Sequence, residues 1–180
     1  YGGFVYPFSN QKSKINFSNP KISSITIDAH KMLQSPYGTG IFICRKGLID
    51  NVLTKEAEYI EGMDLTLCGS RSGANAVAVW MILFTYGPFG WFEKISILQM
   101  RTQFFFFFLD KLNIKYFIKP FMNIVTIHSQ YISEDIAKKF DLVPQQHNQN
   151  NKWYKIVLMD HVEVQHLTSF ISKLKKTIDA

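Results

Sequence analysis

Two apolar runs place the strongest constraint on how this chain can fold. They cover residues 74–86 and 104–109, and both are shorter than the ~20 residues that a helix needs to cross a bilayer. Gly87-Pro88 ends the first run, and the second lies among charged and polar residues. The sequence therefore predicts two long helices, over residues 72–86 and 88–112, and no membrane partner.

The second run contains five consecutive phenylalanines, Phe104 to Phe108. Five adjacent side chains point all round a helix, so they cannot all face one core. We expect some of them to be partly exposed or to lie at a domain or subunit interface. Because aromatic side chains are enriched at permanent interfaces, we predict a partner surface here that includes Phe105 and Phe106.

Composition and charge limit the class of partner. Of the 180 residues, 47% are hydrophobic, which is enough to build a globular core. The net charge of +6 is mild, and most lysines are scattered along the chain. The sequence has no basic stripe, aromatic platform or zinc-finger spacing, so we predict no nucleic acid partner.

Cysteine number and histidine spacing bear on redox environment and metals. Cys44 and Cys68 are too few for a secreted disulfide framework and fit no zinc motif, so we expect a cytoplasmic protein. His161 and His166 miss the spacing that places two ligands on one helical face, and we predict no metal site. The chain opens without Met or a charged-then-apolar leader, and we interpret it as a fragment of a larger protein.

Shorter strand and helix patterns fill the rest of the chain. Residues 22–28 and 40–44 are typical of strands, with a turn around Pro36 and Gly38 between them. The further elements expected are a helix over residues 48–54, strands over 114–118 and 122–128, a helix over 134–140, a strand over 153–159 and a helix over 163–176. These patterns predict a chain of mixed α and β structure that ends in a small α+β unit.

The segment of residues 24–31, Ser-Ile-Thr-Ile-Asp-Ala-His-Lys, carries the most informative chemistry. An apolar strand delivers His30 and Lys31 to its carboxyl end, where α/β proteins gather ligands. A lysine there can form a Schiff base with a carbonyl cofactor once its ammonium has lost a proton, and the histidine can donate to a phosphate. The alternative is that Lys31 extends into solvent and His30 caps the turn.

A second candidate site directly precedes the first long helix. Residues 66–73 include Gly69 and Ser70, and backbone N–H groups and hydroxyls at a helix N-terminus make an anion site of the kind that phosphate binding requires. The segment is neither the phosphate loop that ends in Lys-Ser/Thr nor a serine nucleophile elbow. The alternative is an ordinary helix N-cap, made by Ser70 or Ser72.

Four segments together resemble one enzyme family. In chain order they are residues 1–8, residues 24–31 with the Pro36 and Gly38 turn, residues 69–73, and residues 155–161. They resemble the group II pyridoxal-phosphate-dependent amino acid decarboxylases, and especially the archaeal-type tyrosine/aspartate decarboxylases. The resemblance extends over almost the whole chain and concerns the C-terminal half of the family's sequence.

The resemblance implies an α/β fold of the aspartate-aminotransferase type (fold type I). Residues 1–88 would form the C-terminal part of the large cofactor-binding domain, and residues 89–180 the connecting helix and the small C-terminal α+β domain. Family members place the partner of the pyridine nitrogen, the upstream phosphate loop and the ring-stacking residue before this part of the sequence. The chain alone is therefore expected to bind pyridoxal 5'-phosphate weakly and to be inactive.

The same resemblance assigns roles to particular residues. Lys31 resembles the lysine that bonds to the cofactor, His30 its neighbour on the phosphate side, and Asp28 occupies a position near the phosphate. The loop of Gly69 and Ser70 resembles the one that reaches the phosphate in the neighbouring subunit, which implies a homodimer. Relatives often carry Arg where Lys155 stands and use it to bind the substrate carboxylate, whereas Lys supplies a point charge without the bidentate fork.

The implied reaction is pyridoxal-phosphate-dependent decarboxylation of an L-amino acid to its amine and carbon dioxide. Two alternatives stay open at the level of sequence. A related carbon–carbon lyase, similar to sphingosine-phosphate lyase, shares the His-Lys and Gly-Ser-Arg segments. A noncatalytic remnant or interaction module would keep the fold and use the phenylalanine run only for a subunit interface.

Overall fold

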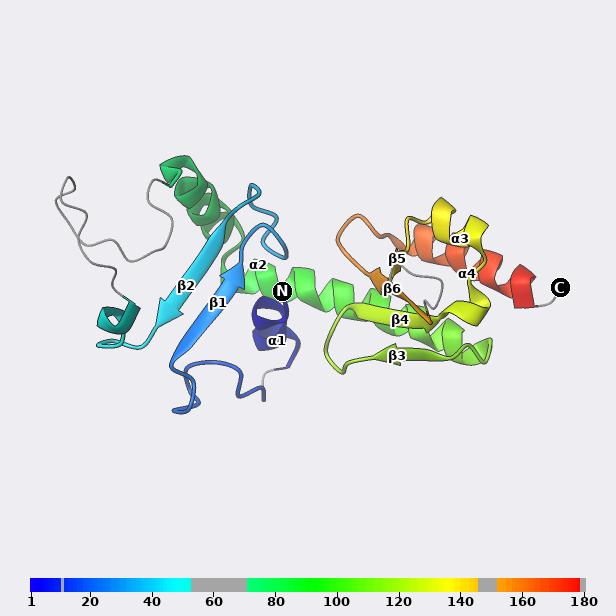
Figure 1. The fold of residues 1–180 in the computed structure, drawn as a ribbon, viewed down its shortest axis with the longest axis horizontal. Helices are drawn as coiled ribbons and strands as arrows, with labels where there is room; N and C mark the ends of the chain where they lie inside the picture. The colour runs from blue at the N-terminus through cyan, green and yellow to red at the C-terminus, as the bar shows by residue number, and fades with distance from the viewer. Residues whose placement is uncertain (11, 53–70, 146–151, 179–180) are drawn as a thin grey trace. The chain divides into compact units, whose positions relative to one another are not determined.

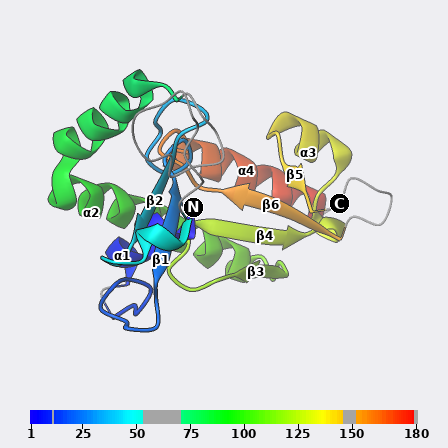
Figure 2. The same ribbon diagram turned by 60° about the vertical axis from the view of Figure 1, so that its left-hand side comes forward.

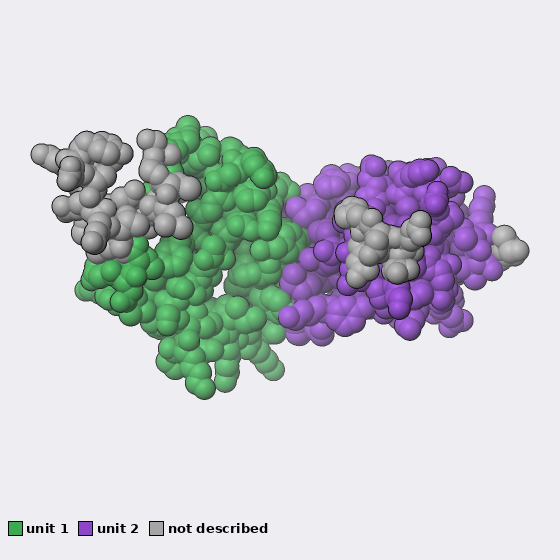
Figure 3. Space-filling model, viewed as in Figure 1, with its two compact units in different colours: residues 1–91 green, residues 92–180 purple. Residues whose placement is uncertain are grey.

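The computed structural model describes residues 1–10, 12–52, 71–145 and 152–178. They form two compact units, Tyr1–Trp91 and Phe92–Ala180, which Figure 3 shows in green and purple. Each unit has buried apolar residues of its own, and each is described here by itself. Within the described residues, no helix is long and apolar enough to cross a membrane.

The first unit is built around a two-stranded antiparallel sheet. Strand β1 (Ser24–Asp28) pairs with β2 (Gly40–Cys44), so that Asp28 lies opposite Gly40 (Figure 1). Both strands were predicted from their apolar patterns and are confirmed. The other elements of this unit are helix α1 (Gly2–Ser9), the 3-10 helix η1 (Ile49–Val52) and the first part of α2 (Gly73–Lys111).

Two contacts fix the segments that flank the sheet. Met32 and Leu33 are each 2% exposed, so the turn that directly follows Lys31 is anchored in the apolar interior. The Arg45 guanidinium donates hydrogen bonds of 2.8 Å to the backbone carbonyls of Phe17, Asn19 and Ile22, which ties the loop before β1 to the end of β2. The two ends of β1 are therefore each held in place, the end next to Lys31 by the buried Met32 and Leu33 and the opposite end by Arg45.

Helix α2 consists of two helical segments with a break at Gly87, where the sequence predicted one. Gly87 has φ 58° and ψ −177°, a backbone conformation that essentially only glycine adopts. Pro88 follows, and its fixed φ suits the first turn of the second segment. The local chemistry of Gly87-Pro88 thus separates the two apolar runs into two helices.

Replacing Gly87 with alanine is expected to lower the free energy of unfolding by about 1–3 kcal/mol, because a Cβ is strained at this φ and ψ. No heavy atom lies within 4 Å of the added Cβ, so the loss comes from the backbone alone. Urea unfolding of the two variants measures it. The matched control, Gly3→Ala within α1, should gain up to about 1 kcal/mol, and equal effects of the two substitutions would contradict the backbone explanation.

The second unit is a four-stranded antiparallel sheet with helices packed on one face. The strand order is β3 (Tyr116–Ile118), β4 (Ile124–His128), β6 (Trp153–Val157) and β5 (Val143–Pro144). Figure 2 shows helix α4 (Val164–Ile178) running along β4 and β6, and α3 (Glu134–Lys139) and the 3-10 helix η2 (Ser129–Tyr131) complete the unit. One core joins Val125 and Ile127 of β4 to side chains of α2, α3 and α4.

The phenylalanine run divides between this core and the surface. Phe105 is fully buried, with its ring centroid 5.8 Å from that of Phe170, whereas Phe107 is 50% exposed beneath the Lys111 ammonium. The expectation that the five side chains do not share one core is confirmed. The expectation that Phe105 contacts a partner is wrong, because Phe105 fills the interior of its own unit; Phe106 is half-buried and stacks on Tyr116.

Candidate active site

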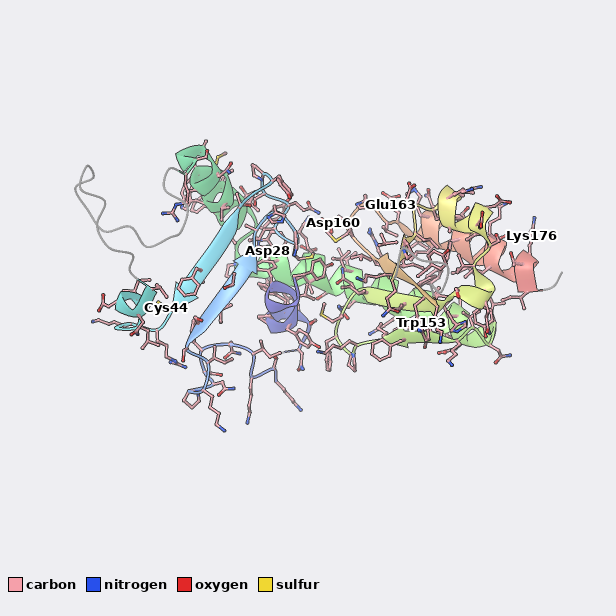
Figure 4. All side chains as sticks on the ribbon, viewed as in Figure 1. Asp28, Cys44, Trp153, Asp160, Glu163 and Lys176 are labelled. Atoms are coloured by element: carbon pink, nitrogen blue, oxygen red, sulfur yellow. The ribbon has the colours of Figure 1, made fainter. Side chains whose placement is uncertain are left out.

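Lys31 lies in a turn that begins where β1 ends. The turn is closed by hydrogen bonds from the Lys31 N–H to the Asp28 carbonyl, at 3.2 Å, and from the Gln34 N–H to the Lys31 carbonyl, also at 3.2 Å. The Lys31 side chain is 48% exposed, and its Nζ lies 2.6 Å from Oδ2 of Asp28, which Figure 4 labels. A buried turn backbone thus presents an accessible amine next to one carboxylate.

The ion pair changes the titration of Asp28. The hydrogen bond that the Lys31 ammonium donates holds the pKa of the Asp28 carboxyl below its ordinary value of 3.8, against a smaller opposing effect of desolvation. Because both side chains are more than one third exposed, the pair contributes little to stability. Its effect is to hold the Lys31 side chain next to Asp28 while no other group binds it.

A titration tests this pair. In an NMR titration, the Asp28 carboxyl should titrate below 3.8 in the wild type and return toward that value in Lys31→Met, which lacks the ammonium. Since the folded-state pKa is the lower one, the stabilisation is present well above pH 3.8 and is lost as the pH falls through the folded-state pKa. Asp50→Asn serves as the control that leaves the Asp28 titration unchanged. An unshifted Asp28 carboxyl would contradict the pairing.

His30 is oriented by the backbone of the loop that leads into β2. Its Nδ1 lies 3.0 Å from the carbonyl oxygen of Thr39, and because a carbonyl can only accept, Nδ1 carries the proton. The same carbonyl accepts the Ala29 N–H at 3.1 Å. Nε2 is therefore the ring nitrogen left for a ligand, and it can donate to an anion when the ring is protonated.

Ser35 and Thr39 support this arrangement, and the sequence analysis missed them. Both are nearly buried, the Thr39 hydroxyl donates to the Pro36 carbonyl at 2.8 Å, and the Ser35 hydroxyl bonds to that of Thr39. The signal in the sequence was a pair of hydroxyl residues on either side of the Pro36 and Gly38 turn. Their hydrogen bonds fix the loop whose carbonyl orients His30.

The second candidate segment is described only from Arg71 onward. Gly69 and Ser70 lie outside the described residues, as does Cys68. Ser72 Oγ accepts a hydrogen bond of 3.4 Å from the N–H of Asn75, which supports Ser72 as the N-cap of α2.

Lys155 belongs to the second unit, whereas Asp28, His30 and Lys31 belong to the first. It is exposed on β6, opposite Thr126 of β4 and Val143 of β5, on the sheet face away from the core helices. Lys155 also borders a pocket of 510 Å³, which is lined mainly by apolar side chains and includes His161 and His166.

Asp160 lies near the end of the segment of residues 155–161, and two side chains of α2 bind it. Lys94 Nζ lies 2.5 Å from Oδ2 of Asp160, and Arg101 donates to the carbonyl oxygens of Asp160 and Val162 at 2.8 and 3.2 Å. These partners are about sixty residues away in the sequence, so no local pattern could have indicated them. They fix the approach to α4, where Figure 4 labels Asp160 and Glu163.

The groups at the end of β1 fit pyridoxal phosphate. An aldehyde needs an accessible amine, which Lys31 supplies, and a phosphate needs a donor, which the Nε2 side of His30 supplies when protonated. Among the residues that the structure describes, no three or more His, Cys, Asp or Glu side chains gather where they could hold a metal ion. The donor set therefore matches a carbonyl cofactor with a phosphate.

Sequence comparison finds relatives over nearly the whole chain. Tryptophan decarboxylase of Clostridium sporogenes is 57% identical over 176 residues, which cover 98% of this chain and 42% of the relative. A probable L-tyrosine/L-aspartate decarboxylase of Methanocella arvoryzae is 30% identical over 99% of this chain and 48% of its own length. The chain thus spans less than half the length of these curated relatives. No family model matches it.

Comparison with solved structures shows the fold. The sphingosine-1-phosphate lyase of Burkholderia pseudomallei superposes with a TM-score of 0.79 at 17% identity, over 99% of this chain and 43% of the other. Glutamate decarboxylase of Lactobacillus brevis gives 0.76 at 17% identity, over 99% and 45%. Both likenesses confirm the predicted fold type I. With the sequence relatives, they show that the chain belongs to the group II pyridoxal-phosphate-dependent amino acid decarboxylase family and corresponds to the C-terminal half of its members.

Proposed function

We propose that this chain supplies the cofactor-binding lysine and the C-terminal domain of a pyridoxal-phosphate-dependent decarboxylase of an L-amino acid. The observation that carries the proposal is the 57% identity to a tryptophan decarboxylase over 98% of the chain. That identity also makes tryptophan the first substrate to test. In this proposal residues 1–88 complete a large cofactor-binding domain, and residues 89–180 form the connecting helix and the small domain.

Lys31 is the catalytic residue of the proposal. Its Nζ must lose a proton before it can bond to the carbonyl carbon of the cofactor, so the ion pair with Asp28 has to open when pyridoxal phosphate binds. Asp28 then acts as a positioning residue that holds the amine at the strand end beforehand. Pyridoxal phosphate bound at Lys31 would supply an electron sink for the bond that breaks at the α-carbon.

The other residues bind and orient. His30 faces the phosphate with Nε2, while the Thr39 carbonyl keeps its Nδ1 occupied. Gly69 and Ser70 contribute backbone and hydroxyl donors to the phosphate of the neighbouring subunit, which makes the active enzyme a homodimer. Lys155 attracts the substrate carboxylate. The protein acts in the cytoplasm, where its amino acid substrate is available.

A chimera tests the function. This chain replaces the matched 176 residues of the Clostridium sporogenes tryptophan decarboxylase, and release of carbon dioxide and the amine is measured with pyridoxal phosphate over a panel of L-amino acids. We expect decarboxylation of tryptophan and none by the 180-residue chain alone. A chimera that folds and binds the cofactor but decarboxylates no amino acid would contradict the proposal and favour a noncatalytic remnant.

The carbon–carbon lyase alternative is tested by the same protein. Its support is the structural likeness to a sphingosine-1-phosphate lyase, which at 17% identity concerns the fold alone. We therefore expect the chimera to leave a long-chain amino alcohol phosphate uncleaved. Cleavage of that compound in place of amino acid decarboxylation would reverse the assignment.

Lys155→Ala in the chimera is expected to raise KM about tenfold to a hundredfold, because one charge-assisted contact to the substrate carboxylate is worth roughly 1.5–3 kcal/mol. Lys155→Arg should keep a low KM, since arginine keeps the positive charge and can donate two parallel hydrogen bonds to a carboxylate. Lys152→Ala, an exposed lysine three positions away, is the control that leaves KM unchanged. If Lys155→Ala kept the wild-type KM, Lys155 would not bind the substrate carboxylate.

A further inference from the structure

Lys155 shares its face of the four-stranded sheet with a threonine. In β6 the two neighbours of Lys155 pack against the core, so Lys155 itself points to the face away from the core helices, which we call the outer face. The same alternation holds in β4, where Val125 and Ile127 are fully buried and Thr126 between them is only half-buried. Thr126 and Lys155 therefore both lie on the outer face.

The strand register places these two residues directly opposite each other. Thr126 of β4 pairs with Lys155 of β6, and Figure 2 shows the two strands side by side. Opposite residues of antiparallel strands have their Cβ atoms about 4.5–5.5 Å apart. The stem of a lysine is flexible, so the ammonium can approach the same ligand as the threonine hydroxyl. One small anion can therefore contact both side chains.

Both polar groups are available to a ligand. Lys155 is exposed, and within the part of the chain that the structure describes, neither its ammonium nor the Thr126 hydroxyl forms a hydrogen bond or an ion pair. A β-branched side chain such as threonine has few χ1 rotamers, so its hydroxyl oxygen occupies a nearly fixed position. The pair thus combines a mobile charge with a short donor that is held in place.

The same row of the sheet has an apolar side chain at each end. Phe117 of β3 lies opposite Thr126 and is 63% exposed, and Val143 of β5 lies opposite Lys155 and is 52% exposed. The two donors are therefore flanked by apolar surface on the outer face. An inorganic phosphate is polar on every side, whereas a carboxylate that belongs to a partly apolar molecule can use the donors and the apolar flanks together.

A lysine alone is a weaker carboxylate site than an arginine. A guanidinium donates two parallel hydrogen bonds to the two oxygens of a carboxylate, whereas an ammonium acts as a point charge. We propose that Thr126 supplies the second donor, so that Lys155 and Thr126 each bind one oxygen of the substrate carboxylate. This inference rests on the proposed function, in which Lys155 attracts that carboxylate, and it adds Thr126 as a further substrate-binding residue.

A ligand that cannot react tests the carboxylate site. Indolepropionate has the indole and the carboxylate of tryptophan but no amine, so it can bind to the cofactor-loaded chimera without turnover. Thr126→Val is expected to raise the Kd of indolepropionate about tenfold, the effect of losing one hydrogen bond to a charged group. Thr126→Ser should keep the wild-type Kd, because serine keeps the hydroxyl. Calorimetry measures the Kd, and circular dichroism checks that the valine variant, which suits a strand, keeps the fold.

The Lys155→Arg background separates a donor from a merely structural role. Arginine brings both parallel hydrogen bonds itself, so adding Thr126→Val there should change the Kd less than about threefold. Methylindole, which has no carboxylate, should bind equally to all of these variants. The matched control is Thr168→Val on α4, which removes an exposed hydroxyl that donates to the Gln165 carbonyl and should leave the Kd of indolepropionate unchanged.

Four results would overturn this inference. They are a cofactor-loaded chimera that does not bind indolepropionate, an unchanged Kd in Thr126→Val, an equal loss in the lysine and arginine backgrounds, and a parallel loss of methylindole binding. Binding is measured without turnover, so the proposed function fails separately. Thr126-dependent binding by a chimera that decarboxylates no amino acid would count against that function and leave the carboxylate site intact, and turnover of tryptophan with an unchanged Kd in Thr126→Val would do the reverse.

Discussion

Lys31→Ala in the chimera is expected to abolish the visible absorbance of bound pyridoxal phosphate and to reduce decarboxylation below detection. No other side chain at the end of β1 offers an amine, since His30 and Asp28 are its polar neighbours there. The loss removes the atom that bonds to the cofactor and not merely a contact, so it exceeds the effect of any surrounding substitution. Absorbance and amine production are measured on the same sample.

Two controls separate the roles of charge and of nucleophile at this position. Lys31→Arg keeps a cation next to Asp28 but cannot give up its proton, so it should be as inactive as Lys31→Ala. Lys46→Ala, an exposed lysine of the same unit, should behave as the wild type. Borohydride reduction followed by peptide mass analysis should place the cofactor on Lys31. A Lys31→Ala protein with an unchanged spectrum would show that another lysine holds it.

Phe105→Ala is expected to lower the free energy of unfolding of the second unit by about 3–5 kcal/mol, the cost of removing a buried phenyl ring. The ring is fully buried and packs against Phe170 of α4, so its removal leaves a cavity between two helices. Urea unfolding monitored by circular dichroism measures the change.

Phe107→Ala is the matched control for the buried ring. It removes the same atoms two positions away from a side chain that is 50% exposed, and it should cost less than half as much. If both substitutions lowered the free energy of unfolding equally and Phe105→Ala also changed the oligomeric state, Phe105 would lie at an interface and not in the core.

The parts of the fold that sequence could predict depend on local chemistry. The break at Gly87-Pro88 follows from the backbone preferences of those two residues, and the strands β1 and β2 follow from apolar alternation. Helix α1 was not predicted, because Gly2, Gly3 and Pro7 all disfavour a helix. It forms where Phe4 and Val5 are buried, which is a tertiary effect.

The candidate site likewise has residues that the sequence could indicate and contacts that it could not. Lys31 and His30 could be indicated because a strand end next to a turn is visible in the sequence. The ion pair of Lys94 and Asp160 could not, because the two residues are 66 positions apart and meet only in the folded unit. Strand β5 likewise consists of two residues whose pairing with β6 is set by the sheet and not by their own propensity.

The hydrogen bond from His30 to the Thr39 carbonyl determines which kinds of mutation this site tolerates. Every residue type has a carbonyl at its backbone, so Thr39→Val or Thr39→Ser keeps the acceptor that fixes the imidazole. An inserted or deleted residue between Gln34 and Thr39 would instead move that oxygen by more than a hydrogen-bond length. The loop is therefore constrained in length as well as at Ser35, Gly38 and Thr39. Homologues with an active lysine should carry no gaps here, and a library built to alter the site should keep the residue count and these three residues.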